Sequence, residues 1–267
     1  MNRTFCHKLI FVVASAGAMF LIAGCNPGPI VDARRPAPPA HGAGPLLTLD
    51  PATASTLSGT AILEGTPPAP RFIDMSAEPS CRQMHPEPGN FSDVVTGPGG
   101  GLANVVVYVR SGLGNYRFGA PSNPVLLDQK GCLYDPRIVA LMVGQRLEIR
   151  NSDSTLHNIH SMSRENPSWN RSEPEGATVF ETFPRAELAI PLVCNVHPWM
   201  RGFAFVFDNP YYAITDAAGK FTIPDLPPGN YTIEAWQERY GVLDQPVTLA
   251  PHASASLTFT FHGETGH

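Results

Sequence analysis

The sequence has 267 residues, of which 15% are charged, and its formal net charge at pH 7 is −5. This composition gives no sign of a basic surface of the kind that binds nucleic acid, so we expect no nucleic-acid partner. The 28 prolines and 24 glycines are spread among short runs of Val, Ile, Phe and Thr, and this pattern predicts an all-β fold.

The N-terminus has the pattern of an export signal. A short basic start is followed by an apolar run from 9 to 23, which ends in Leu21-Ile22-Ala23-Gly24-Cys25. Such a run is short for a membrane span and typical of a secretory signal. Its ending resembles a bacterial lipobox, which implies a signal peptide at 1–24 and a lipid on Cys25. The alternative is an ordinary export signal that contains a cysteine. The lipid would hold the chain on the periplasmic or cell-surface side of a membrane, in an oxidising compartment.

Residues 25–56 are rich in Pro, Ala and Gly and lack apolar periodicity, so we expect an extended tether. The remaining residues suffice for one large or two small domains. Short apolar runs separated by turn residues predict strands in a sandwich or barrel. The predicted strands are 59–65, 104–110, 124–128, 137–143, 145–151, 177–183, 188–194, 202–208, 220–226, 231–237, 245–250 and 255–262.

Two family resemblances divide these strands. The stretch TDAAGKFTIPDLPPGNYTIEA (215–235) resembles the carboxypeptidase regulatory-like family, whose fold is a small transthyretin-like sandwich. The segments SGTAILEGTPPAP (58–70) and LANVVVYVRSG (102–112) resemble earlier strands of the same family. The resemblance implies one sandwich built from 57–113 and 208–263, with a different domain at 120–207 inserted in it or packed beside it.

The inserted stretch resembles the cupredoxins, and most closely the amicyanins. The match lies in YDPRIVALMVGQRLEIRNSDSTLHNIH (134–160) and CNVHPWMRGFAFV (194–206). The resemblance implies a Greek-key sandwich that binds one type 1 (blue) copper ion. The implied ligands are His157, Cys194, His197 and Met200. Asn151 corresponds to the family's asparagine that ties the His-bearing loop to the Cys loop.

The residue types suit this chemistry, because two imidazoles and a thiolate with a weak axial thioether are the preferred ligands of a copper ion that changes oxidation state. The competing interpretation is that Cys194 is a buried small apolar residue beside incidental histidines. If Cys25 is acylated and Cys194 binds copper, Cys81 and Cys132 remain as a pair, and a disulfide is their natural form in an oxidising compartment.

The leading functional prediction is a lipid-anchored electron-transfer protein and not an enzyme, because we find no further His-rich site. We expect His197 to lie nearest the surface, and a redox partner protein to dock on apolar surface around His197, Pro198 and Trp199. One alternative is a cell-envelope binding module whose transthyretin-like domain recognises a glycan or a protein. The other is a protein that stores or delivers copper without electron transfer.

Overall fold

The computed structural model describes residues 44–47, 50, 52–69, 71–86 and 93–263. The predicted signal peptide, Cys25 and most of the predicted tether lie outside the described residues. The described part is an all-β structure of two sandwiches, named A and B below, together with one short α-helix, α1 (Pro79–Met84), and one 3-10 helix (Pro98–Gly100). No helix in this part of the chain is long and apolar enough to cross a membrane.

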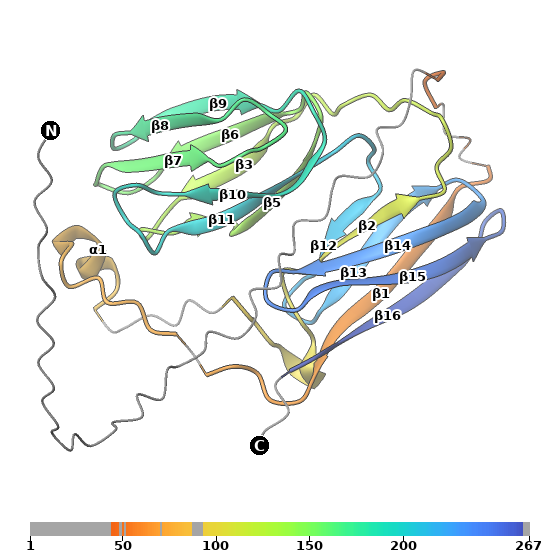
Figure 1. Cartoon of the computed structure of the whole chain (residues 1–267), viewed down its shortest axis with the longest axis horizontal. Coiled ribbons are helices and arrows are strands. Elements are labelled where there is room, and N and C mark those ends of the chain that lie inside the picture. The colour runs from red at the N-terminus through yellow and green to blue at the C-terminus, as the bar shows by residue number, and fades with distance from the viewer. Residues whose placement is uncertain (1–43, 48–49, 51, 70, 87–92, 264–267) are drawn as a thin grey trace, which may run out of the picture. The chain divides into compact units, whose positions relative to one another are not determined.

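Sandwich A contains strands from both ends of the described chain. One sheet has the order β13-β1-β16 and the other the order β12-β2-β14-β15 (Figure 1). β1 pairs in parallel with β16 and antiparallel with β13, while β2 lies between β12 and β14. The chain therefore leaves sandwich A after β2 and returns to it at β12. Its strands are β1 (Ser55–Glu64), β2 (Val106–Ser111), β12 (Tyr212–Ile214), β13 (Lys220–Leu226), β14 (Gly229–Gln237), β15 (Gly241–Leu249) and β16 (Ser254–His262).

Two turns explain the motif found at 215–235. Asp216 Oδ1 accepts hydrogen bonds from the backbone N–H groups of Ala218 and Lys220, at 2.8 and 2.9 Å, and so closes the turn before β13. Gly219 in this turn has φ +74°, and a Cβ there would lie 2.2 Å from the Ala61 carbonyl oxygen. Only glycine fits such a position without strain. At the next turn, the Tyr231 hydroxyl donates to the Pro227 carbonyl at 2.7 Å.

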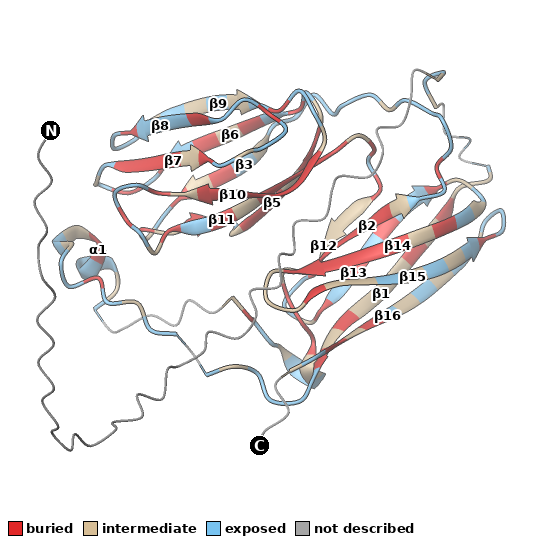
Figure 2. Cartoon of the chain, viewed as in Figure 1, coloured by how far each residue is buried: buried red, intermediate tan, exposed pale blue. Residues whose placement is uncertain are grey.

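Sandwich B is built from the intervening strands. One sheet has the order β5-β11-β10-β7-β8 and the other the order β4-β3-β6-β9 (Figure 1). Buried residues line the strands of both sandwiches, and in sandwich B they form one apolar core between the two sheets (Figure 2). The strands are β3 (Val125–Gln129), β4 (Tyr134–Asp135), β5 (Ile138–Met142), β6 (Arg146–Asn151), β7 (His157–Ser161), β8 (Trp169–Glu173), β9 (Thr178–Thr182), β10 (Glu187–Val193) and β11 (Arg201–Phe207).

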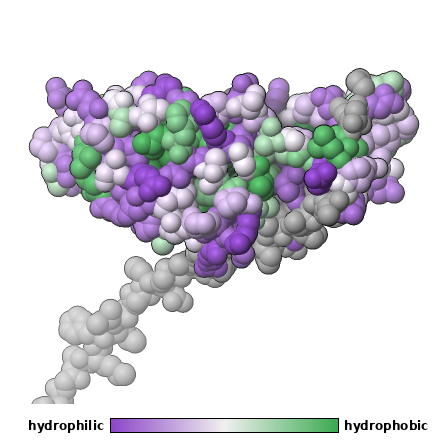
Figure 3. Space-filling model, turned by 90° about the horizontal axis from the view of Figure 1, so that it is seen from above, coloured by the Kyte–Doolittle hydropathy of each residue, from purple (hydrophilic) through white to green (hydrophobic). Residues whose placement is uncertain are grey.

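A separate apolar cluster joins strands of the two sandwiches. Tyr108 and Trp236 from sandwich A pack in it with Phe205 and Phe207 of β11. The ring centroids of Phe205 and Trp236 lie 4.8 Å apart, and those of Tyr108 and Phe207 5.1 Å apart. Aromatic contacts of this kind stabilise a fold beyond the apolar area that they bury. They hold β11, the strand that leaves the Cys194 loop. On the face seen in Figure 3, apolar residues gather in separate patches among hydrophilic ones.

Candidate metal centre

The loop from Cys194 to Met200 joins two neighbouring strands, β10 and β11. These strands are antiparallel, and Val193 pairs with Arg201 at the base of the loop. The loop is closed by two backbone hydrogen bonds: Cys194 N–H donates to the Met200 carbonyl at 3.1 Å, and Met200 N–H to the His197 carbonyl at 2.9 Å. The close turn brings the side chains of Cys194 and His197 to one point.

Three metal-binding side chains converge at this loop. His157 begins β7, which pairs with β10. Its Nδ1 lies 3.0 Å from Nδ1 of His197, and Cys194 Sγ lies 3.8 Å from the same His197 nitrogen. All three residues are buried, and their ligand atoms lie within 4.8 Å of one another. The structure therefore brings together three of the four ligands that the sequence predicts.

The protonation state of His197 suits metal binding. Burial, together with the neighbouring His157, lowers the pKa of His197 below its usual range, so its imidazole is neutral at pH 7, as a metal ligand must be. The His197 backbone N–H donates to Cys194 Sγ at 3.3 Å. Cys194 is the free cysteine among the described residues.

Met200, the predicted axial ligand, is fully buried in the core cluster that also contains Cys194. Soft sulfur donors and two imidazole nitrogens in one dry cluster fit a copper ion better than a hard cation such as Mg²⁺ or Ca²⁺. The other metal-capable groups in the described chain, Cys81-Cys132-His197 and Cys132-Asp153-His157, overlap with this cluster.

An outer set of hydrogen bonds fixes His157. The buried carboxylate of Asp153 accepts from His157 Nε2 at 2.8 Å and from the backbone N–H groups of Gly131 and Cys132, both at 2.7 Å. Since the Nε2 proton is held by Asp153, the Nδ1 lone pair of His157 points at His197 and Cys194. A partner of this kind fixes the tautomer and orientation of a ligating histidine.

Two asparagines lie near His157, and the contact with the Cys194 loop predicted for Asn151 is made by Asn158. Asn151 Nδ2 donates to the carbonyls of Thr155 and Glu173, both at 2.8 Å, so its amide holds the loop before His157 against β8. The hydrogen bond to the Cys194 loop comes instead from Asn158, whose Oδ1 accepts from Asn195 N–H at 3.0 Å. The prediction that Asn151 ties the two loops together is corrected accordingly.

The predicted disulfide between Cys81 and Cys132 is present. Its position next to His197 is not predicted by the sequence. Cys81 Sγ lies 3.6 Å from His197 Nε2, on the side of the imidazole that faces away from the cluster. His197 has 0% of its surface exposed, so the prediction that it lies nearest the surface is wrong. The physical reason is that the Cys81 segment, far away in the sequence, covers the imidazole edge.

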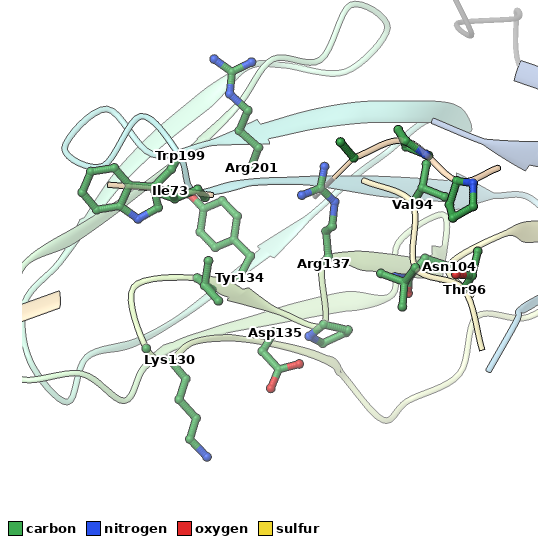
Figure 4. Close-up of a pocket in the computed structure, with 17 residues that line it drawn as sticks. Ile73, Val94, Thr96, Asn104, Lys130, Tyr134, Asp135, Arg137, Trp199 and Arg201 are labelled. Atoms are coloured by element: carbon green, nitrogen blue, oxygen red, sulfur yellow. The ribbon is translucent and has the colours of Figure 1, made fainter. Parts of the chain in front are cut away.

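The remaining two residues of the predicted docking surface are accessible. Pro198 is exposed and Trp199 is partly buried, with its ring centroid 5.2 Å from that of His197. The Trp199 indole donates to the Cys132 carbonyl at 3.1 Å. Trp199 also lines a pocket of about 960 Å³, shown in Figure 4 with Tyr134, Arg137 and Arg201 around it. Arg137 in this pocket forms a bidentate ion pair with Glu238 of sandwich A.

Comparison with known proteins gives one family-model match and several similar solved structures. Residues 207–262 match the family model of the carboxypeptidase regulatory-like domain. Solved structures similar to this chain include the copper-containing nitrite reductase of Thermus scotoductus, a mutant of amicyanin in its reduced state and a purple cupredoxin from Nitrosopumilus maritimus.

The similarity covers about a third of the chain. The nitrite reductase is 20% identical, with 33% of this chain and 23% of that chain covered and a TM-score of 0.30. The amicyanin mutant is 20% identical, with 32% of this chain and 84% of that chain covered and a TM-score of 0.30. The purple cupredoxin is 21% identical, with 31% of this chain and 98% of that chain covered and a TM-score of 0.27. No curated protein sequence matches the chain.

Proposed function

We propose that this protein transfers single electrons through one type 1 copper ion, held by His157, Cys194, His197 and Met200. The observation that supports the proposal is the convergence of two imidazole Nδ1 atoms and one thiol sulfur in a fully buried cluster. Two histidines and a cysteine in an apolar core carry a desolvation cost, which the contacts among them and a bound metal ion would offset.

The residues of the cluster are suited to this role. When bound, copper supplies a one-electron couple between its two oxidation states. Asp153 fixes the His157 ring, and the two backbone hydrogen bonds of the loop fix Cys194 and Met200. The packed core around these residues permits little movement of the ligands, which keeps the reorganisation that accompanies electron transfer small.

We propose that a redox partner protein docks at Pro198 and Trp199. His197 is buried, so a partner has no direct contact with its imidazole in this conformation. Trp199 is partly accessible and packs on the His197 ring. Its indole thus provides a short path between the cluster and the surface.

We further propose that the protein is exported and lipid-anchored at Cys25. The disulfide between Cys81 and Cys132 supports export, because disulfides persist mainly in oxidising compartments. The LIAGC sequence supports the anchor at a membrane. In this reading the carboxypeptidase regulatory-like sandwich carries the copper domain, and the protein is not an enzyme.

The test is a copper(II) titration of the metal-free protein, followed by visible absorption. We expect one equivalent to produce an intense thiolate-to-copper band that a mild reductant bleaches reversibly. Cys194→Ser should abolish the band. His157→Ala should weaken copper binding by more than about 100-fold, since loss of even an outer hydrogen-bonding partner of a ligand costs 10- to 100-fold. Met200→Leu should chiefly shift the reduction potential.

His160→Ala is the matched control, because His160 lies on the same strand, β7, and outside the ligand cluster. Its band and affinity should equal those of the unchanged protein. A wild-type protein that stays colourless with copper, or a Cys194→Ser variant that keeps the band, would refute the proposal. A copper complex that transfers its ion to an acceptor but shows no reversible couple would favour copper delivery instead.

A further inference from the structure

A short segment closes the metal centre on the His197 side. This cover segment, residues 73–85, contains α1 and contributes Met75 and Cys81 to the core of sandwich B. The disulfide to Cys132 holds it covalently. A contact of 2.7 Å between His85 Nε2 and the Gly131 carbonyl holds its end, and Ile73 packs against the same core at its beginning.

The cover segment lies directly on the candidate ligand His197. Cys81 Sγ is 3.6 Å from His197 Nε2, and both groups are buried. The other face of the cluster is closed by sandwich B itself, where His157 is 0% and Cys194 4% exposed. Within the segment, α1 itself has six residues, and of these Cys81 alone is buried. A helix of this length is not stable by itself in water.

We propose that the disulfide-held cover segment is the element that determines access to the metal centre. While the disulfide is intact, the segment excludes water, small ligands and partner atoms from His197 and Cys194. When the disulfide is absent, the segment detaches locally and the cluster opens on its His197 side, while sandwich B stays folded. The shielding of Cys194 is independent of copper, whereas its consequence for a bound ion rests on the function proposed above.

The test uses Cys194 of the metal-free full-length protein as a reporter. Its alkylation by iodoacetamide is followed by mass spectrometry of the Cys194 peptide, for the unchanged protein and for Cys81→Ser/Cys132→Ser. We expect alkylation of Cys194 to be at least about 10-fold faster in the double variant without denaturant. This rate should not change in low urea, because a local opening exposes little new surface, whereas global unfolding accelerates steeply with urea.

Two further variants distinguish shielding of Cys194 by the cover segment from an effect of general stability. Phe183→Leu removes packing in the same core, at a buried side chain that contacts Trp169. It should leave alkylation without urea near the wild-type rate. Met75→Ala loosens the cover segment and keeps the disulfide, so it should accelerate alkylation even if the double serine variant does not fold. Equal alkylation rates for the unchanged protein, Met75→Ala and a folded double variant would overturn the proposal.

A second measurement connects the cover segment with the bound ion. Removal of copper from the loaded protein by an excess of chelator should be at least about 10-fold faster in Cys81→Ser/Cys132→Ser than in the unchanged protein. A double variant that reacts faster with iodoacetamide but releases copper at the wild-type rate would overturn the claim that the segment controls access to the ion. A protein that takes up no copper would refute the proposed function, and the alkylation result would still decide the shielding.

Discussion

Asp153 is the residue whose replacement most directly tests how the candidate ligands are held. Its side chain is 2% exposed, and the carboxylate accepts three hydrogen bonds, from Gly131 N–H at Oδ1 and from Cys132 N–H and His157 Nε2 at Oδ2. Asp153→Asn preserves the size and shape of the side chain. It replaces one acceptor oxygen by an NH₂ group and removes the negative charge.

The expected loss of stability follows from the count of acceptors. In the better orientation, the amide oxygen of Asn keeps the bonds to Cys132 and His157, and its NH₂ group faces the N–H of Gly131. The N–H of Gly131 and the new NH₂ group are then both left without an acceptor, at a cost of about 1–3 kcal/mol each. The two remaining charge-assisted bonds also become weaker neutral ones. We therefore expect the free energy of unfolding to fall by about 2–6 kcal/mol. Copper affinity should fall about 10-fold, at the lower end of the range for outer hydrogen-bonding partners, because His157 keeps an acceptor at Nε2.

The assays are urea unfolding of the metal-free protein, followed by tryptophan fluorescence, and copper competition with a chelator. Asp135→Asn is the matched control, since Asp135 lies in the same sandwich and is exposed. It should change the free energy of unfolding by less than about 0.5 kcal/mol. If Asp153→Asn were as stable as Asp135→Asn and bound copper equally well, the role assigned to this carboxylate would be wrong.

Two other predictions concern the folds themselves. Gly219→Ala should destabilise sandwich A by more than about 1 kcal/mol, because the alanine would need φ +74° and place its Cβ 2.2 Å from the Ala61 carbonyl. Gly176→Ala is the control for the cost of the backbone conformation alone, since Gly176 has φ +72° and no atom within 4 Å of its Cβ position. Equal urea midpoints for the two variants would contradict the steric argument. Glu187 is desolvated by burial, but hydrogen bonds from Ser163, Arg164 N–H and Asn166 outweigh this and lower the pKa of its carboxyl. The ionised Glu187 carboxylate therefore stabilises the folded protein above the unfolded pKa of about 4.5, and this stabilisation is lost as the pH falls through the lower folded pKa. Glu187→Gln should destabilise the protein at pH 7 and make the urea midpoint fall less steeply below pH 4.5. A variant with the wild-type acid profile would contradict this.

Much of the metal cluster could be predicted because its parts lie in local sequence patterns. Cys194 and His197 lie three positions apart, and the loop between the adjacent strands turns them toward one point. Met200, three positions further on, closes the loop through its backbone. The turn before β13 is equally local, since Asp216 accepts from the N–H groups of Ala218 and Lys220, both within four residues. Cys81 and Cys132 could be paired because the other two cysteines considered already had assignments.

The contacts around the cluster could not be predicted, because they join distant segments. Cys81 and His197 are 116 residues apart, and nothing in the polar helix α1 indicates that it covers an imidazole. In the sequence NSDST, Asp153 has the pattern of a turn residue, and an acid four residues before a histidine is too common to indicate a buried pair. β8 was missed because only its two ends, Trp169 and Glu173, are buried, so its sequence lacks an apolar run.

The two outer contacts of the histidines meet at a single turn. Asp153, which holds His157, accepts from the backbone of Cys132, and the cysteine bonded to Cys132 contacts the outer nitrogen of His197. One disulfide thus lies next to the supports of both rings. If the disulfide shields only, its removal should leave His157 fixed, because the Asp153 carboxylate binds the backbone N–H of residue 132 whatever its side chain. If it also positions the rings, the Cys132 turn should shift and both imidazoles should move together. The absorption spectrum of the copper-loaded Cys81→Ser/Cys132→Ser variant distinguishes the two, since it depends on ligand geometry: an unchanged band with faster copper loss indicates shielding alone.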